Sequence, residues 1–228
     1  MRRLLIAVLV VLLIIAGGVA YLFLNDPEDI APELPTATPA PQSRIFGIDT
    51  EATTLAFSLD LGGATIDGTF DITDGTLLLV PAEDGWKLQV NLIVEGQSVE
   101  TGSSLRNQLL IIALKAKEYP YGVYTGLSQE IITDPEEEQQ VLLVGEIELS
   151  GIQNPQNGLT TMKLDGDVLT ADTRLDIDFT DFGADFSALG ASNIMGIDLH
   201  IEAHSDLAPE EPLDLDDFSG EVAAPSFG

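Results

Sequence analysis

WKLQVNLIV, residues 86–94, places an apolar side chain at every second position. Its alternating apolar residues are Trp86, Leu88, Val90, Leu92 and Val94, with Lys87, Gln89 and Asn91 between them. A period of two is typical of a β-strand with one buried face. The same alternation recurs in residues 55–61, 141–149, 162–168, 175–179 and 197–201, and a further strand begins at Phe70 and Ile72 and continues through 77–80 after a kink near Asp74-Gly75. About eight strands of one-sided polarity predict an all-β fold, either a closed antiparallel barrel or a sandwich.

One segment has helical instead of strand periodicity. In Ser103 to Lys117 (SSLRNQLLIIALKAK), the apolar residues Leu105, Leu109, Ile112 and Ala116 recur at helical spacing. Ser103 or Ser104 can cap the start of a helix, and two lysines suit its end. We therefore expect a single short helix, about mid-domain, between two groups of strands. Turn signals at Asp84-Gly85, Asp134-Pro135 and Asn157-Gly158 separate many of the strands.

The N-terminus reads as a membrane anchor. Leu4 to Leu24 contains no charged residue, and about 20 apolar residues span a bilayer core of ~30 Å. Arg2 and Arg3 precede this stretch and acidic residues follow it, so the positive-inside rule places the N-terminus in the cytoplasm and residues 25–228 outside. The alternative is a cleaved signal peptide ending near Gly18-Val19-Ala20, but Tyr21 to Leu24 continue the apolar run past that point.

Composition divides the remainder into three parts. Residues 25–43 form an acidic, proline-rich linker, 44–205 form the domain, and 206–228 form an acidic tail that we expect to be disordered. The chain has 38 Asp and Glu against 9 Lys and Arg, a net charge of −29, which repels phosphate backbones and excludes nucleic acid as a partner. Cysteine is absent, which excludes disulfides and Cys-ligated metals.

No arrangement of residues points to catalysis or to a cofactor. His200 and His204 are expected on the outer face of a strand, about 13 Å apart and too distant to share one metal ion unaided. Asp165, Asp167 and Asp172 do not have the spacing of a calcium loop. We therefore predict a protein that is not an enzyme and has no metal or cofactor.

The residues around the predicted helix carry a resemblance to a known family. Ser98-Val99-Glu100-Thr101-Gly102, then Leu105-Arg106-Asn107, then Glu118-Tyr119-Pro120 resemble the most recognisable part of the YceI-like family. Gly68-Thr69-Phe70 upstream and Val144 to Gly151 downstream are similar to further family elements, in the expected order. Asn107 stands where the family usually has Asp, and residues 110–114 replace a segment that often carries paired Phe. These departures leave the fold unchanged and the ligand's identity open.

The resemblance implies an eight-stranded, lipocalin-like antiparallel barrel that holds a long apolar molecule such as a polyisoprenoid. The candidate cavity residues are Phe57, Phe70, Leu88, Val90, Leu92, Arg106, Leu109, Ile112, Tyr119, Leu143, Met162, Leu164, Ile177, Phe179, Leu199 and Ile201. Arg106 either meets a polar headgroup or forms a structural ion pair. The alternative function is a structural or stress-related surface protein with a filled barrel and no ligand. A homodimer is left open.

Overall fold

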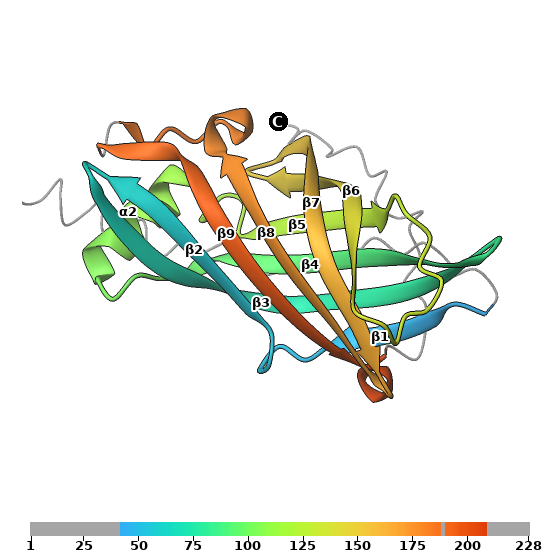
Figure 1. Ribbon diagram of the computed structural model, residues 1–228. Coiled ribbons are helices and arrows are strands. Elements are labelled where there is room, and N and C mark those ends of the chain that lie inside the picture. The colour runs from blue at the N-terminus through green and yellow to red at the C-terminus, as the bar shows by residue number, and fades with distance from the viewer. Residues whose placement is uncertain (1–41, 188–189, 209–228) are drawn as a thin grey trace, which may run out of the picture. The chain divides into compact units, whose positions relative to one another are not determined.

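The computed structural model describes residues 42–187 and 190–208 (Figure 1). These residues contain one antiparallel sheet, closed on itself, with one α-helix and two short 3-10 helices. The elements in chain order are β1 (Arg44–Ile48), β2 (Thr54–Leu61), β3 (Ala64–Ala82), β4 (Gly85–Glu100), α2 (Ser104–Ala113), β5 (Tyr121–Ser128), β6 (Gln139–Leu149), β7 (Ile152–Asp165), β8 (Val168–Asp178), η1 (Phe179–Phe182), β9 (Ala191–His204) and η3 (Ser205–Leu207).

The sheet is an eight-stranded barrel. Its order runs β3-β2-β9-β8-β7-β6-β5-β4, and pairing of β3 with β4 closes the ring. The ninth strand, β1, pairs with β3 and β9, the same two neighbours that flank β2. β1 and β2 are thus two halves of one strand, interrupted at residues 49–53. The structure confirms the antiparallel barrel and excludes the sandwich.

Alternation along each strand decides which side chains fill the barrel. Leu88, Val90 and Leu92 on β4 are at most 2% exposed and point inward, as the period of two predicts. The long β3 shifts its register against β4 between Ile72 and Asp74, which confirms the irregularity predicted near Asp74-Gly75. These strands are stabilised chiefly by burial of this inward face.

Three sequence-based expectations about local structure were wrong. Asn157-Gly158 is not a turn but lies within β7, where Gly158 faces inward and an added Cβ would lie 2.9 Å from the Thr173 side chain. Residues 162–168 are not one strand, because Gly166, with φ +62°, turns the chain between β7 and β8. Phe179 does not end a strand but begins η1.

The helix α2 begins at Ser104 and ends at Ala113, shorter than the predicted 103–117. Lys115, with φ +53°, takes the left-handed conformation that stops it. Figure 1 shows α2 and the turn η1 toward one end of the barrel and η3 (red) at the opposite end.

The residues predicted to anchor the chain in a membrane, 4–24, lie outside the described part, as does most of the predicted linker and tail. Among the described residues, no helix is long and apolar enough to cross a bilayer. Asp206 and Leu207, at the start of the predicted tail, belong to η3.

Candidate ligand cavity

The barrel encloses a cavity of about 120 Å³. On the same measure a site for one water molecule needs only about 10–15 Å³, so this space is far larger than a packing defect. Strands β2 to β6, β8 and β9 and the segment after α2 contribute most of its wall. The lining residues that are not glycine are Leu55, Phe70, Val90, Leu92, Val94, Leu114, Ala116, Tyr119, Tyr121, Val123, Tyr124, Leu143, Ile147, Leu149, Ser150, Thr160, Ala171, Thr173, Leu175, Ile177, Phe179, Ile197 and Ile201, and Gly96 and Gly122 complete it.

Small inward residues on neighbouring strands explain why the space exists. Gly122, Tyr124, Gly126 and Ser128 are the inward positions of β5, and Gly145 pairs with Gly126 from β6. The Tyr124 hydroxyl contacts the positions where Gly126 and Gly145 would carry a Cβ. The tyrosine ring can therefore lie along the wall of the barrel instead of crossing its interior. Alanine or a larger residue at either glycine would displace it.

Burial raises the pKa of the Tyr124 phenol to about 12. The apolar surroundings disfavour the charged phenolate, so the neutral hydroxyl persists throughout the physiological range. Among the described residues this hydroxyl makes no hydrogen bond. Its O–H group is therefore available to a bound molecule.

The hydroxyl groups of Ser150, Thr160 and Thr173 in the cavity wall are already paired within the protein. The hydroxyls of Thr160 and Thr173, facing each other across β7 and β8, are 2.7 Å apart. The Ser150 hydroxyl donates to the Leu114 carbonyl at 2.7 Å and so ties the β6–β7 turn to the segment after α2. With these groups paired internally, the cavity offers almost entirely apolar surface.

The opposite end of the barrel is filled. Leu79, Leu88, Ile132, Leu164 and Leu169, which we call the filled end, are each at most 1% exposed, and none lines the cavity. The loop between β5 and β6 covers them.

This covering loop is fixed on both sides. At Ile132 it exchanges two backbone hydrogen bonds with Trp86 on β4, of 2.9 and 2.7 Å. At Pro135 its carbonyl accepts a hydrogen bond from the Leu164 N–H on β7. The loop thus spans the barrel and closes this end.

At the α2 end, the cavity reaches the surface. Tyr119 lines the cavity and is 38% exposed, and Leu149 and Ile147 beside it are partly exposed. Gly151, in the β6–β7 turn, packs against the Tyr119 ring. Part of this end is closed by phenylalanines: the Phe179 and Phe186 rings lie 5.3 Å apart and the Phe57 and Phe70 rings 5.1 Å apart. The side near Tyr119 therefore offers a route between the cavity and the surface.

The sixteen candidate residues divide into three groups. Those that line the cavity are Phe70, Val90, Leu92, Tyr119, Leu143, Ile177, Phe179 and Ile201. Those that pack in or against the core without lining it are Phe57, Leu88, Met162, Leu164 and Leu199. Those on α2, away from the cavity, are Arg106, Leu109 and Ile112; Leu109 is 36% exposed and Ile112 is 68% exposed.

Arg106 has a local structural contact. Its guanidinium donates to the Thr101 carbonyl at 2.7 Å and to the Thr101 hydroxyl at 3.3 Å. Asn107 accepts from the Thr101 N–H and hydroxyl, so both residues bind α2 to the end of β4. Among the described residues Arg106 forms no ion pair. The predicted structural contact is therefore made to a backbone carbonyl and a hydroxyl, not to a carboxylate.

Sequence reasoning missed several residues of the cavity wall. Tyr124 and Gly122 on β5, Leu149 on β6 and the Thr160–Thr173 pair all line it. A signal was present in the spacing of Gly122 and Gly126, because glycines four apart on a strand share one face and leave that face without side chains.

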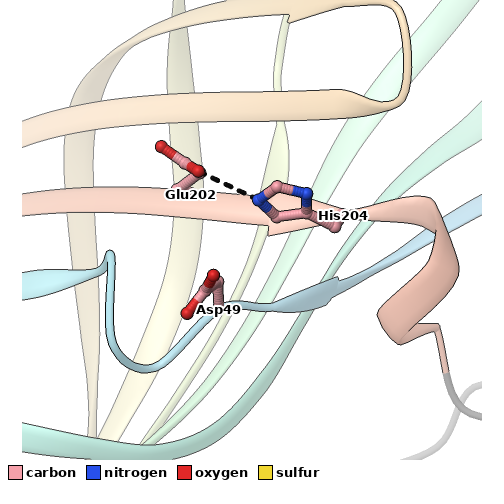
Figure 2. A group of neighbouring side chains, drawn as sticks. All are labelled: Asp49, Glu202 and His204. Atoms are coloured by element: carbon pink, nitrogen blue, oxygen red, sulfur yellow. Dashed lines mark hydrogen bonds and ion pairs between the residues drawn. The ribbon is translucent and has the colours of Figure 1, made fainter.

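The two histidines lie on the outer wall. His200 Nδ1 is 2.7 Å from Asp172 Oδ1, and His204 Nε2 is 2.9 Å from Glu202 Oε1. Among the described residues one group brings three metal-ligating side chains together, namely Asp49, Glu202 and His204 (Figure 2). It is separate from the cavity, because these residues face away from the interior.

A closed antiparallel barrel with an apolar interior cavity defines the class of lipocalin-like barrels, which can hold one small ligand. Within that class, a family model for the YceI-like domain matches residues 46–204, and the chain therefore belongs to the YceI-like family. This confirms the resemblance seen in the sequence. A search of the curated proteins found no match.

Solved structures support the same fold. A polyisoprenoid-binding domain from Saccharophagus degradans, implicated in plant cell wall breakdown, is 16% identical, with a TM-score of 0.57 over 72% of this chain and 98% of that one. BcnA from Burkholderia cenocepacia is 17% identical, with a TM-score of 0.54 over 68% of this chain and 99% of that one.

Proposed function

We propose that this protein is a membrane-tethered, extracytoplasmic binding protein that holds a long apolar lipid, a polyisoprenoid or similar molecule, inside its barrel and catalyses no reaction. The observation that carries the proposal is the apolar cavity, filled at one end and reaching the surface near Tyr119. A blind apolar space of this kind suits a chain-like ligand better than a compact polar one. The similarity to a polyisoprenoid-binding domain supports the same ligand class.

The energetics favour such a ligand without further polar contacts. Each buried CH₂ group contributes about 0.8 kcal/mol, so several isoprene units offset the cost of immobilising the chain. The Tyr124 hydroxyl gives a polar group in the cavity wall that can donate to an oxygen of the ligand.

Mass spectrometry of lipids bound to the full chain tests the proposal. After gentle extraction in a membrane-solubilising polymer, we expect a long-chain apolar lipid to copurify. Val90→Phe places an aromatic ring in the cavity. Because the ring takes up part of the cavity volume, the longest lipid chain recovered should be shorter than with the parent protein. Val144→Phe is a matched control, since Val144 points outward on β6 and is 48% exposed. Absence of lipid from the parent protein, or identical lipid profiles in the two variants, contradicts the proposal.

The location rests on the sequence alone, on the uncharged stretch of residues 4–24 after Arg2 and Arg3. Protease added to cells with a permeabilised outer envelope should release a fragment that starts within residues 25–43. A domain that stays cell-associated until the membrane itself is lysed would show that this orientation is wrong.

A further inference from the structure

Three side chains with metal-binding groups meet on the outer wall of the barrel, where the interrupted strand β1–β2 runs beside β9. Asp49 follows β1, and Glu202 and His204 lie on β9 (Figure 2). One ligand atom from each, a carboxylate oxygen or an imidazole nitrogen, lies within 4.8 Å of those of the other two. Asp49 is more than 150 positions away in the chain, so the barrel closure itself creates the group.

Strand geometry places two of the three donors side by side. Residues two apart on a strand point to the same face, so Glu202 and His204 are neighbours on the outside of β9. Their closest atoms, Glu202 Oε1 and His204 Nε2, are 2.9 Å apart. Asp49, in the loop that follows the adjacent strand β1, supplies the third donor.

The interruption between β1 and β2 holds the side chain of Asp49, the third donor, in place. Asp49 Oδ1 accepts hydrogen bonds from the backbone N–H groups of Glu51 and Ala52, at 2.9 and 3.2 Å. Its second carboxylate oxygen remains for another partner. The Asp49 N–H donates to the Glu202 carbonyl at 2.9 Å, which holds the two acidic residues in register.

Thr53 secures the same junction. Its hydroxyl donates to the Glu202 carbonyl, and the Glu202 N–H donates back to that hydroxyl at 3.1 Å. The loop of residues 49–53 is therefore attached to Glu202 on both sides, and the carboxylates of Asp49 and Glu202 approach each other on an ordered backbone.

No Lys or Arg of the described residues forms an ion pair with the carboxylates of this group. Among the described residues the Lys or Arg ion pair is Arg174 with Asp198, and neither Asp49 nor Glu202 has such a partner. The side chains of Glu202 and His204 are only 33% and 26% exposed, so water screens them incompletely. Two partly buried carboxylates beside a single imidazole form a site of net negative charge, unless a cation joins them.

We propose that Asp49, Glu202 and His204 bind one divalent transition-metal ion of the Zn²⁺ class. One imidazole nitrogen and two carboxylate oxygens are a ligand set that zinc accepts at about 2.0–2.2 Å, whereas Mg²⁺ and Ca²⁺ prefer oxygen alone. Donor atoms now up to 4.8 Å apart reach those distances by rotation of the carboxylates, with solvent completing the coordination. The ion would join both halves of the first strand to β9 and stabilise the barrel by mass action.

Calorimetric titration of the purified full chain with ZnCl₂, in excess Mg²⁺ to occupy non-specific carboxylates, tests the site. We expect one Zn²⁺ per chain and a rise in the melting temperature. Asp49→Asn, Glu202→Gln and His204→Ala should each weaken the affinity by at least about tenfold, because each removes a ligand.

The matched control is His200→Ala. His200 lies on the same face of β9 and pairs with Asp172, but within residues 42–187 and 190–208 no third donor joins that pair. This variant should bind Zn²⁺ as the parent does. Circular dichroism establishes whether each variant is folded. If His204→Ala does not fold, the near-isosteric Asp49→Asn still tests the site. Absent binding by the parent, unchanged affinity in Asp49→Asn, or an equal loss in His200→Ala would each overturn the proposal. None of these outcomes bears on lipid in the cavity.

Discussion

Inward and outward side chains alternate in the same way at both ends of the barrel. At one end the inward side chains fill the interior, and at the other end they leave a cavity. On β4, Leu88 belongs to the filled end and Leu92, four residues later, lines the cavity, although both are at most 2% exposed. On the neighbouring strands Leu92 lies beside Gly75 and Tyr124, whereas Leu88 lies beside Leu79. Burial alone therefore does not separate a packed core from a ligand cavity. The size of the side chains on the neighbouring strands separates a packed core from a cavity.

The largest expected effect comes from placing a charge at each end. Leu88→Asp should abolish folding or cost at least about 4 kcal/mol, because its carboxylate would lie in a dry, filled interior. Leu92→Asp should cost at least about 2 kcal/mol less, since the cavity has room for water molecules to accompany the new charge and the filled end has none. Thermal melts followed by circular dichroism measure both. The uncharged pair Leu88→Asn and Leu92→Asn separates charge from shape, and equal losses at the two positions would remove the distinction between the ends.

A smaller effect tests how dry the cavity is. The folded-state pKa of Tyr124, about 12, exceeds its unfolded value of 10.0. The native state therefore keeps a proton that the unfolded state loses. Stability from this group is fully present below pH 10 and is lost as the pH rises toward 12, by up to about 2.7 kcal/mol. Denaturant unfolding should show that Tyr124→Phe lacks this loss, while Tyr119→Phe, at an exposed tyrosine, retains it. The same pH dependence in Tyr124→Phe and the parent would indicate a wet cavity.

The smallest effect concerns the hydroxyl pair in the wall. Thr160→Val alone leaves the Thr173 hydroxyl without its partner and should cost about 1 kcal/mol. The double variant Thr160→Val with Thr173→Val should recover most of that loss, and a double-mutant cycle on unfolding free energies measures the coupling. If water reaches the pair, it will replace the missing partner and the coupling will vanish.

Much of the barrel was predictable because strand alternation is a local property. Residues 86–94 lie in β4, and α2 begins within one residue of the predicted start of the helix. The misread turn at Asn157-Gly158 shows the limit. A local Asn-Gly signal was overridden by Thr173 on the neighbouring strand, which fills the place of the missing side chain.

The candidate site was harder to predict, for a physical reason. Leu88 and Leu92 occupy equivalent positions in the sequence pattern. The residues beside them on the neighbouring strands decide which of the two lines the cavity. Tyr124 lies along the wall because of Gly145, a residue on another strand. The Asp49–Glu202–His204 group depends on closure between the first and last strands. Such features require the register between strands, which a single sequence does not supply.

The loop held by Ile132 and Pro135 closes one end of the barrel, so the cavity has a limited depth. A limited depth sets how much of a long ligand the barrel can hold. Under the proposed function, a flexible chain inserted from the Tyr119 side would stop at Leu88 and its neighbours, and the part of the chain longer than the cavity would stay outside. The end of the ligand that carries its chemistry would then remain presented at the rim.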